Sequence, residues 1–573
     1  MSLYTSTIRP TLILLGPDYR RKGLFVLPLL LLQSLVDVLS VASFAPMALM
    51  VVRPESVRAN PFLIKLYITF SFESEQSFAL AWVVGIAVLF LVKHVMSILI
   101  TRIKARYAFG VSAFLSERML SRLIKLEYIE YHDLQSSAEQ VKIAHLPISF
   151  ANNILLGIAT LFTEGLILFM LMVSLMVYDW RSVFFLMMII LPAIVFYRII
   201  KKKINEINHS LKTNYPGLIH HILRLFENFL EINLYQRKAY FVQKVRKQNH
   251  DLHQSQILQT ILQANSFRLF ETTAAVGLCL LVLYTQVMHT SPDTTTLLLG
   301  LYTVAGFRAV PSLNRIFVAL LQIKTNEHVV AGLTKFSTQE KACSPQVPIH
   351  FNETLDLNNL SFGFAGKPLI LVDCSLSITK GQRIALMGAS GCGKTTLLLL
   401  IMRFLKETRG EIRVDGCLLE DCHIDAWRKH LAYVPQSPVI LDGSIIENIA
   451  FGMDPKEADI EKIQKLLALL GLGQWLNQLP DGLMTQFGER GIKLSGGQRQ
   501  RLVIARALYS EAEVLLFDEA TNQVDAITET EVYEALNATS HQSKTIIMVT
   551  HHKTSLHFFD KVYHLEGGQI RES

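Results

Sequence analysis

Charged residues are scarce in this sequence. Asp, Glu, Lys and Arg make up 18% of its 573 residues, whereas an ordinary soluble domain contains roughly 25%. Half of the residues are hydrophobic, and the mean hydropathy is +0.33. The apolar excess falls before residue 325, and the remainder has the composition of a soluble α/β domain. A wholly soluble protein is therefore excluded, and a membrane domain followed by a soluble domain is predicted.

Cysteine is rare as well. The six cysteines follow no zinc or haem spacing, and five fall in the part predicted to be cytosolic, where thiols stay reduced. No cleavable signal peptide is recognised. The net charge of +7 does not indicate a nucleic-acid partner, because the basic residues cluster at the ends of apolar segments and form no stripe interleaved with aromatics.

Several apolar segments are long enough to cross a bilayer, which takes about twenty residues in a helix. The six candidates are residues 23–52, 78–102, 150–177, 182–200, 265–288 and 295–323. Long polar helical stretches separate the second from the third and the fourth from the fifth. We therefore predict an all-α transmembrane domain of six helices over 23–325.

Basic residues set the orientation. The groups Arg20-Arg21-Lys22, Lys104 with Arg106, and Lys201–Lys203 lie on one side of six spans, and the positive-inside rule makes that side cytoplasmic. Both termini are then cytoplasmic. Residues 1–22 are amphipathic and predict an interfacial helix. A linker is predicted over 326–350, followed by a soluble domain over 351–573.

Residues 388–395 read Gly-Ala-Ser-Gly-Cys-Gly-Lys-Thr after a buried strand pattern at 384–387, and they match the phosphate-binding pattern GxxxxGK[ST]. Such a loop wraps phosphates with backbone N–H groups and a helix N-terminus. Lys394 is expected to reach the β- and γ-phosphates, and the Thr395 hydroxyl to coordinate Mg²⁺. The residues predicted to hold ATP here are Gly388, Ser390, Gly391, Cys392, Gly393, Lys394, Thr395 and Thr396.

Two further motifs complete an ATPase pattern. Residues 494–498 read Leu-Ser-Gly-Gly-Gln, and the apolar run 514–517 ends in Asp518-Glu519. With the phosphate loop, these motifs resemble the ATP-binding cassette (ABC) proteins. The likeness is specific in 355–573 and rests on the span pattern alone in 1–325. Since the spans precede the ATPase on one chain, the arrangement resembles ABC exporters and implies an α/β P-loop ATPase domain.

The resemblance assigns catalytic and metal-binding roles. Asp518 would hold Mg²⁺ through water, and Glu519 would act as general base on the attacking water. Gln436 matches the residue of the family's Q-loop, which touches Mg²⁺ and the water. His551 matches the switch histidine at the γ-phosphate, and its neighbour His552 is the less favoured choice.

The resemblance also implies a dimer. Phe364 falls where the family stacks adenine on an aromatic ring, and one chain carries one phosphate loop and one signature. Ser495, Gly496, Gly497 and Gln498 would complete the site of a second copy, so a homodimeric half-transporter is expected. Coupling helices are expected near 130–140 and 215–235.

One segment departs from the family pattern. Asp525 is kept, but the preceding Asn522-Gln523-Val524 differs from the family's Ser-Ala-Leu, so communication between the two sites stays an open question. Glu489 matches the cross-linking loop of exporters.

Within the exporters, the membrane half resembles flippases of lipid-linked oligosaccharides. Lys93, Arg268 and Arg308 lie in or at the edge of apolar spans. A cation in such a position is a candidate functional residue, and the resemblance implies that these three would contact an anionic, lipid-linked substrate. Residues 306–315 and a possible external helix over 56–72 add to this likeness. One alternative is that the cations snorkel or pair with carboxylates such as Asp37, Glu164 or Glu271. Another is that they serve an anionic peptide or a lipid such as the endotoxin core.

Two other functions stay open. One is export of a peptide, natural product or drug-like amphiphile, and the other is an ATP-gated regulator, against which the intact Glu519 and His551 argue. The expected cofactors are ATP and Mg²⁺. The expected location is the bacterial inner membrane, with the ATPase domain cytoplasmic.

Overall fold

The computed structural model describes most of the chain. The described residues are 4–44, 46–47, 50, 61–72, 74–133, 137–178, 182–287, 292–337, 347–488, 494–520, 526–539, 544–551 and 553–573. The chain divides into two compact units, and each is considered by itself. Unit 1 comprises Met1–Leu126 and Glu130–Glu340, and unit 2 comprises Glu127–Ile129 and Lys341–Ser573.

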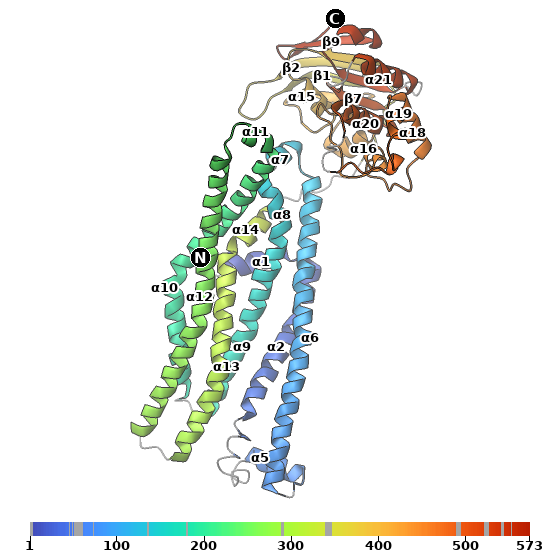
Figure 1. Cartoon of the computed structure of the whole chain (residues 1–573). Coiled ribbons are helices and arrows are strands. Elements are labelled where there is room, and N and C mark those ends of the chain that lie inside the picture. Colours follow the sequence, from blue (N-terminus) through green and yellow to red (C-terminus); the bar gives the residue numbers. More distant parts are fainter. Residues whose placement is uncertain are drawn as a thin grey trace. The chain divides into compact units, whose positions relative to one another are not determined.

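Unit 1 is built from helices in its described residues (Figure 1). Two of them, α6 and α12, contain 50 residues each, which at 1.5 Å per residue exceeds the bilayer's hydrocarbon thickness of about 30 Å. They therefore carry polar extensions beyond their apolar halves. The elements are η1 Tyr4–Ile8, α1 Arg9–Leu14, α2 Pro17–Ala42, α5 Pro61–Thr69, α6 Glu75–Ile124, α7 Tyr128–Asp133 (whose first two residues are grouped with unit 2), α8 Ser137–Ser149, η2 Phe150–Leu155, α9 Leu156–Tyr178, α10 Ser182–Glu227, α11 Phe229–Leu234, α12 Lys238–Val287, α13 Pro292–Thr325 and α14 Glu327–Ser337.

Five helical stretches among the described residues are long and apolar enough to span a membrane. They are Pro17–Ala42, Glu75–Ile124, Ile143–Met176, Lys238–Val287 and Tyr302–Thr325. The sixth predicted span, 182–200, lies in the first half of α10, where the side chains of most residues before 190 are not described. The helical membrane fold predicted from the sequence is thus confirmed. The count of six spans stays a prediction, because α10 is not among the five stretches found.

Three predicted boundaries differ from the structure. The expected interfacial helix over 1–22 is divided, because the chain leaves α1 at Leu15 in an extended conformation and Pro17 starts α2. The first span was expected over 23–52, but α2 ends at Ala42. Within the predicted linker 326–350, the segment 327–337 forms α14, whose apolar face is buried at Val329, Val330 and Leu333.

The long helices of unit 1 pack in a fixed order. α2 contacts α6 and α9, α9 contacts α13, and α13 contacts α10 and α12; Figure 1 shows α9, α12 and α13 running side by side. Phe270 of α12 and Phe317 of α13 meet edge to face in one of the cores. This order matters below, because it brings α2, α6, α9 and α13 together deep in the unit.

The described residues of unit 2 form two sheets. The larger has the order β10-β9-β3-β8-β7-β6, with β9, β3, β8, β7 and β6 parallel, and the smaller, antiparallel sheet has the order β2-β1-β4-β5. In parallel α/β sheets ligands bind at the carboxyl ends of the strands. The strands are β1 Thr354–Phe362, β2 Leu371–Thr379, β3 Arg383–Met387, β4 Arg409–Val414, β5 Cys417–Leu418, β6 Leu431–Val434, β7 Val514–Asp518, β8 Thr545–Val549, β9 Lys561–Glu566 and β10 Gln569–Glu572.

Helices flank the larger sheet, whose central strands β7 and β8 are fully buried. The helical elements of unit 2 are α15 Lys394–Ile401, η3 Asp421–His423, α16 Ile424–Lys429, α17 Ile445–Ile449, α18 Ile460–Leu469, α19 Gly473–Asn477, η4 Gly482–Met484, α20 Gly496–Tyr509, α21 Ala526–Thr539 and η7 Lys553–Phe558. The α/β architecture expected for 351–573 is confirmed.

Candidate nucleotide site and intramembrane charges

The loop between β3 and α15 requires glycine. Gly388 has φ +151°, and a Cβ there would lie 2.5 Å from the Leu565 carbonyl oxygen. Gly391 and Gly393 have φ of +79° and +110°, values that other residues rarely adopt. The backbone can therefore curl tightly before Lys394 opens α15.

Lys394 places its charge inside this loop. Its side chain is buried, and Nζ donates to the carbonyl oxygens of Gly388 and Ala389, each at 2.9 Å. The N-terminus of α15 adds a positive dipole end to the same place. Backbone N–H groups, an ammonium and a helix N-terminus together suit the phosphates of a nucleotide.

Oxygen ligands for a hard cation lie beside the loop. The Thr395 hydroxyl donates to Asp518 Oδ1 at 3.1 Å, and the Tyr433 hydroxyl donates to Asp518 Oδ2 at 3.3 Å. Burial raises the pKa of Asp518 above its ordinary value, while the bonds from Thr395 and Tyr433 act in the opposite direction. A hydroxyl next to a buried carboxylate fits Mg²⁺, which favours oxygen ligands and binds the carboxylate form.

Three strands bring the predicted catalytic groups together. Gln436, just after β6, donates from Nε2 to Glu519 Oε2 at 2.7 Å. His551, just after β8, lies with Nε2 3.0 Å from Glu519 Oε1. Glu519 itself follows β7 and has φ +52°, a backbone strain of the kind found at functional sites. The carboxylate is thus held from two sides at the strand ends.

The remaining predicted nucleotide residues are spread over unit 2. Phe364 follows β1, is 37% exposed and meets Phe362 edge to face, so one side of its ring is open. Ser495 caps α20 through a reciprocal pair of bonds with Gln498. Glu489, His552 and the segment 522–525 with Asp525 lie outside the described residues.

A second group of charges lies among the membrane helices. Asp37 on α2 accepts from Lys93 of α6 at 2.9 Å and from Arg308 of α13 at 3.1 Å. Lys93 Nζ also donates to the Ser40 hydroxyl at 3.0 Å. Two of the three cations proposed to meet the substrate are therefore bound to a carboxylate.

Glu164 on α9 extends this charge cluster. Its side chain is 6% exposed and accepts from the Ser312 hydroxyl and from Arg315, each at 2.7 Å, and Arg308 lies at 3.4 Å. Sequence reasoning missed Ser312 and Arg315. The spacing of positions 308, 312 and 315 could have indicated them, because it places the three side chains on one face of a helix.

Arg268 is different from the other two cations. It lies exposed on α12, and no ion pair joins it to any residue that the structure describes. The structure therefore supports the alternative interpretation, pairing with carboxylates, for Lys93 and Arg308, and leaves Arg268 accessible.

Comparisons with known proteins bear on the family of the chain. A family model described as ABC transporter matches residues 371–522. The ATP-dependent lipid A-core flippase of Francisella tularensis subsp. tularensis (strain SCHU S4 / Schu 4) is 30% identical over 427 residues, 73% of this chain and 69% of the flippase. The heterocyst differentiation ATP-binding protein HepA of Nostoc sp. is 35% identical over 300 residues, and this match spans 48% of the chain and about half, 49%, of HepA.

The fold also has a close structural counterpart. A bacterial Atm1-family ABC exporter with ATP bound superposes with a TM-score of 0.77 at 21% identity, covering 96% of this chain and 94% of the exporter. At this identity the likeness speaks for the fold, which combines a helical membrane domain and an α/β ATPase domain on one chain.

Proposed function

This chain belongs to the ABC transporter family, and from that premise we propose that it acts as a homodimeric flippase for an anionic, lipid-linked amphiphile of the oligosaccharide-pyrophosphate type. The coarser function follows from the family: the chain is an ATP-driven exporter of the bacterial inner membrane, with ATP and Mg²⁺ as cofactors and a cytoplasmic ATPase domain. The dimer and the substrate class are the parts proposed here.

The catalytic proposal rests on the Glu519 carboxylate held by Gln436 and His551. Glu519 takes a proton from the attacking water, while Lys394 binds the phosphates. Thr395 and Asp518 would hold Mg²⁺, which supplies charge neutralisation at the phosphates. Ser495 at the start of α20 completes the site of the other copy.

An exposed apolar surface supports the dimer. It surrounds α11 and consists of Phe226, Phe229, Leu230, Leu234 and Tyr235, which are 63–77% exposed. This stretch begins 26 residues beyond the predicted end of the fourth span at residue 200. A helix of that length measures about 39 Å at 1.5 Å per residue, which puts the stretch outside the bilayer. Contiguous apolar surface on a water-exposed segment marks an interaction site, and a second copy of the chain is the partner we propose.

Leu230→Glu is expected to weaken the dimer by about tenfold or more, since burying a leucine contributes about 1.5–3 kcal/mol and 1.4 kcal/mol equals tenfold. The measurement is the dimer fraction of the purified chain by mass photometry over a dilution series. Leu230→Met, which keeps the apolar volume, should behave as wild type. Identical dilution curves for Leu230→Glu and wild type would remove α11 from the interface.

The substrate proposal rests on the charge left over among the membrane helices. Among the described residues, Lys93, Arg308 and Arg315 pair with the carboxylates of Asp37 and Glu164, so these five side chains together carry one net positive charge. Arg268 adds an exposed cation on a helix apolar enough to span the membrane. Cations in a membrane span are costly unless they meet water or an anion, and a pyrophosphate would satisfy them.

Arg268→Ala is expected to abolish substrate-stimulated ATPase and to leave basal ATPase within about twofold, because the group lies far from the ATPase motifs in sequence and binds no described partner. The assay compares ATPase rates in lipid nanodiscs with and without a polyprenyl-pyrophosphate-linked oligosaccharide. Arg246→Ala, an exposed cation on the same helix outside the predicted span, is the matched control and should keep stimulation.

Other outcomes of this assay separate the remaining functions. Stimulation by a peptide or an amphipathic drug, with none by the lipid-linked sugar, would favour the general exporter. Equal loss of basal and stimulated activity in Arg268→Ala would mean that Arg268 supports the fold. ATP binding without turnover in the wild type would favour a gated regulator.

A further inference from the structure

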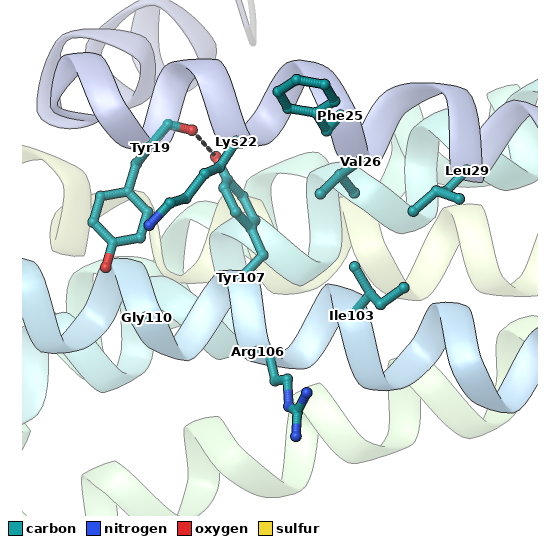
Figure 2. A pocket seen from close by; sticks show the side chains of 9 residues that line it. All are labelled: Tyr19, Lys22, Phe25, Val26, Leu29, Ile103, Arg106, Tyr107 and Gly110. Atoms are coloured by element: carbon teal, nitrogen blue, oxygen red, sulfur yellow. Dashed lines mark hydrogen bonds between the residues drawn. The ribbon is translucent and has the colours of Figure 1, made fainter.

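A groove lies between the first two long helices. α2 and α6 pack against each other and enclose a cavity of about 360 Å³ that opens at the surface of unit 1 (Figure 2). This volume is in the range of small-molecule sites, about 300–1,000 Å³. The lining residues are Tyr19, Lys22, Phe25, Val26, Leu29, Ile103, Arg106, Tyr107 and Gly110.

Two tyrosines line one end of the groove. The Tyr107 hydroxyl donates to the Tyr19 carbonyl oxygen at 3.1 Å, and the two ring centroids lie 6.4 Å apart. A Cβ at Gly110 would lie 3.4 Å from the Tyr19 ring, so α6 passes the ring at van der Waals distance. The pair ties the two helices together at this level and leaves the space beside it open.

The polar end of the groove is positively charged. Lys22 Nζ lies 4.9 Å from the centre of the Tyr19 ring, and Figure 2 shows the Lys22 side chain reaching between the two tyrosines. Arg106 also lines the groove, and Figure 2 shows its guanidinium pointing away from Lys22 and from the two tyrosines. Both cations are exposed, and neither pairs with a carboxylate in the part of the chain that the structure describes.

The other end is apolar and faces outward. Phe25 is 76% exposed and Ile103 is 40% exposed, and Val26 and Leu29 line the wall between them. The basic end coincides with the cytoplasmic ends of the first two spans, which the positive-inside rule locates at Arg20–Lys22 and Lys104–Arg106. The groove therefore runs from the headgroup level into the hydrocarbon region.

We propose that this groove binds an anionic phospholipid of the cytoplasmic leaflet. The phosphate would lie at Lys22 with the two tyrosines, and an acyl chain would follow Phe25, Leu29 and Ile103. Basic pockets between membrane helices on the cytoplasmic side favour anionic headgroups. The lipid is a resident ligand and not the cargo, so the proposal is independent of the substrate class argued above.

The test is a lipid titration of the full chain in detergent, followed by native mass spectrometry without ATP. Phosphatidylglycerol and phosphatidylcholine with the same acyl chains are the two probes. The wild type should bind the first phosphatidylglycerol molecule more tightly than the first phosphatidylcholine molecule. Lys22→Ala should lower that affinity about fivefold, the effect of one basic residue near an anionic lipid, and should leave phosphatidylcholine binding unchanged.

Two further variants make the result specific to the groove. Arg21→Ala removes the neighbouring exposed cation, which does not line the groove, and should keep the phosphatidylglycerol affinity of the wild type. Val26→Trp fills the groove but keeps the cations, and it should lower the affinity for phosphatidylglycerol. Wild-type affinity in both Lys22→Ala and Val26→Trp would overturn the proposal. Equal losses in Lys22→Ala and Arg21→Ala would also overturn it, since they would indicate a diffuse basic surface.

Discussion

Glu519→Gln is expected to lower the ATPase rate by about 10²–10⁴-fold, the contribution of a positioned general base. The amide keeps the shape of the side chain but cannot take a proton from the attacking water. Nucleotide binding should persist, because Lys394, Thr395 and Asp518 do not depend on Glu519 for their contacts. The measurements are steady-state ATPase in nanodiscs and equilibrium binding of a fluorescent ATP analogue.

Glu511→Gln is the matched control for this change. It removes one carboxylate from an exposed position just before β7, and the ATPase rate should stay at the wild-type value. Hydrolysis by Glu519→Gln at the wild-type rate would show that another group accepts the proton. Loss of nucleotide binding together with turnover would instead mean that Glu519 supports the fold of the strand ends.

The second large effect is expected in the membrane charge cluster. Glu164→Ala should destabilise the chain by about 3–5 kcal/mol, because removing one partner leaves a buried charge uncompensated. The Arg308 side chain is 12% exposed, and its Nε already has no hydrogen-bond partner among the described residues. Without Glu164, Arg308 retains its ion pair with Asp37 but loses the second carboxylate, and the Ser312 hydroxyl loses its acceptor. Thermal unfolding in detergent measures the loss.

Arg315→Ala provides the contrast within the same cluster. This arginine also binds Glu164, but its side chain is 56% exposed, so we expect a loss of at most about 1 kcal/mol. Glu164→Gln should fall between the two, because the amide oxygen can still accept from Ser312. Equal losses in Glu164→Ala and Arg315→Ala would contradict the view that burial decides the cost.

Much of the nucleotide site was predictable because its signals are local. The phosphate loop from Gly388 to Thr395 is contiguous, and its glycines adopt the positive φ angles that such a loop demands. The strand ends at Asp518 and His551 could be placed because apolar runs precede them. The contact of Glu519 with Gln436, 83 positions away, was inferred only through resemblance to a family.

The membrane domain was predictable in outline and not in detail. The lengths of the apolar runs in the sequence predicted the membrane helices, because a helix that crosses a bilayer requires a long run of apolar residues. Helix ends were less certain: α2 stops at Ala42, and α14 begins at Glu327 within a segment expected to be a linker. There the buried face of Val329, Val330 and Leu333 packs against other helices of unit 1, and tertiary contact overrides a weak local signal.

By itself, the sequence determined the class of this protein, a membrane domain joined to an ATPase, and it predicted the residues proposed to bind and hydrolyse ATP. These properties depend on composition and on neighbours along the chain. Only the tertiary structure decided which intramembrane cations are neutralised. Arg308 meets Asp37 across 271 positions, and Ser312 meets Glu164 across 148, whereas Arg268 lies exposed. Whether a charge is paired depends on which helix faces meet, and that is set by the packing of α2, α9 and α13.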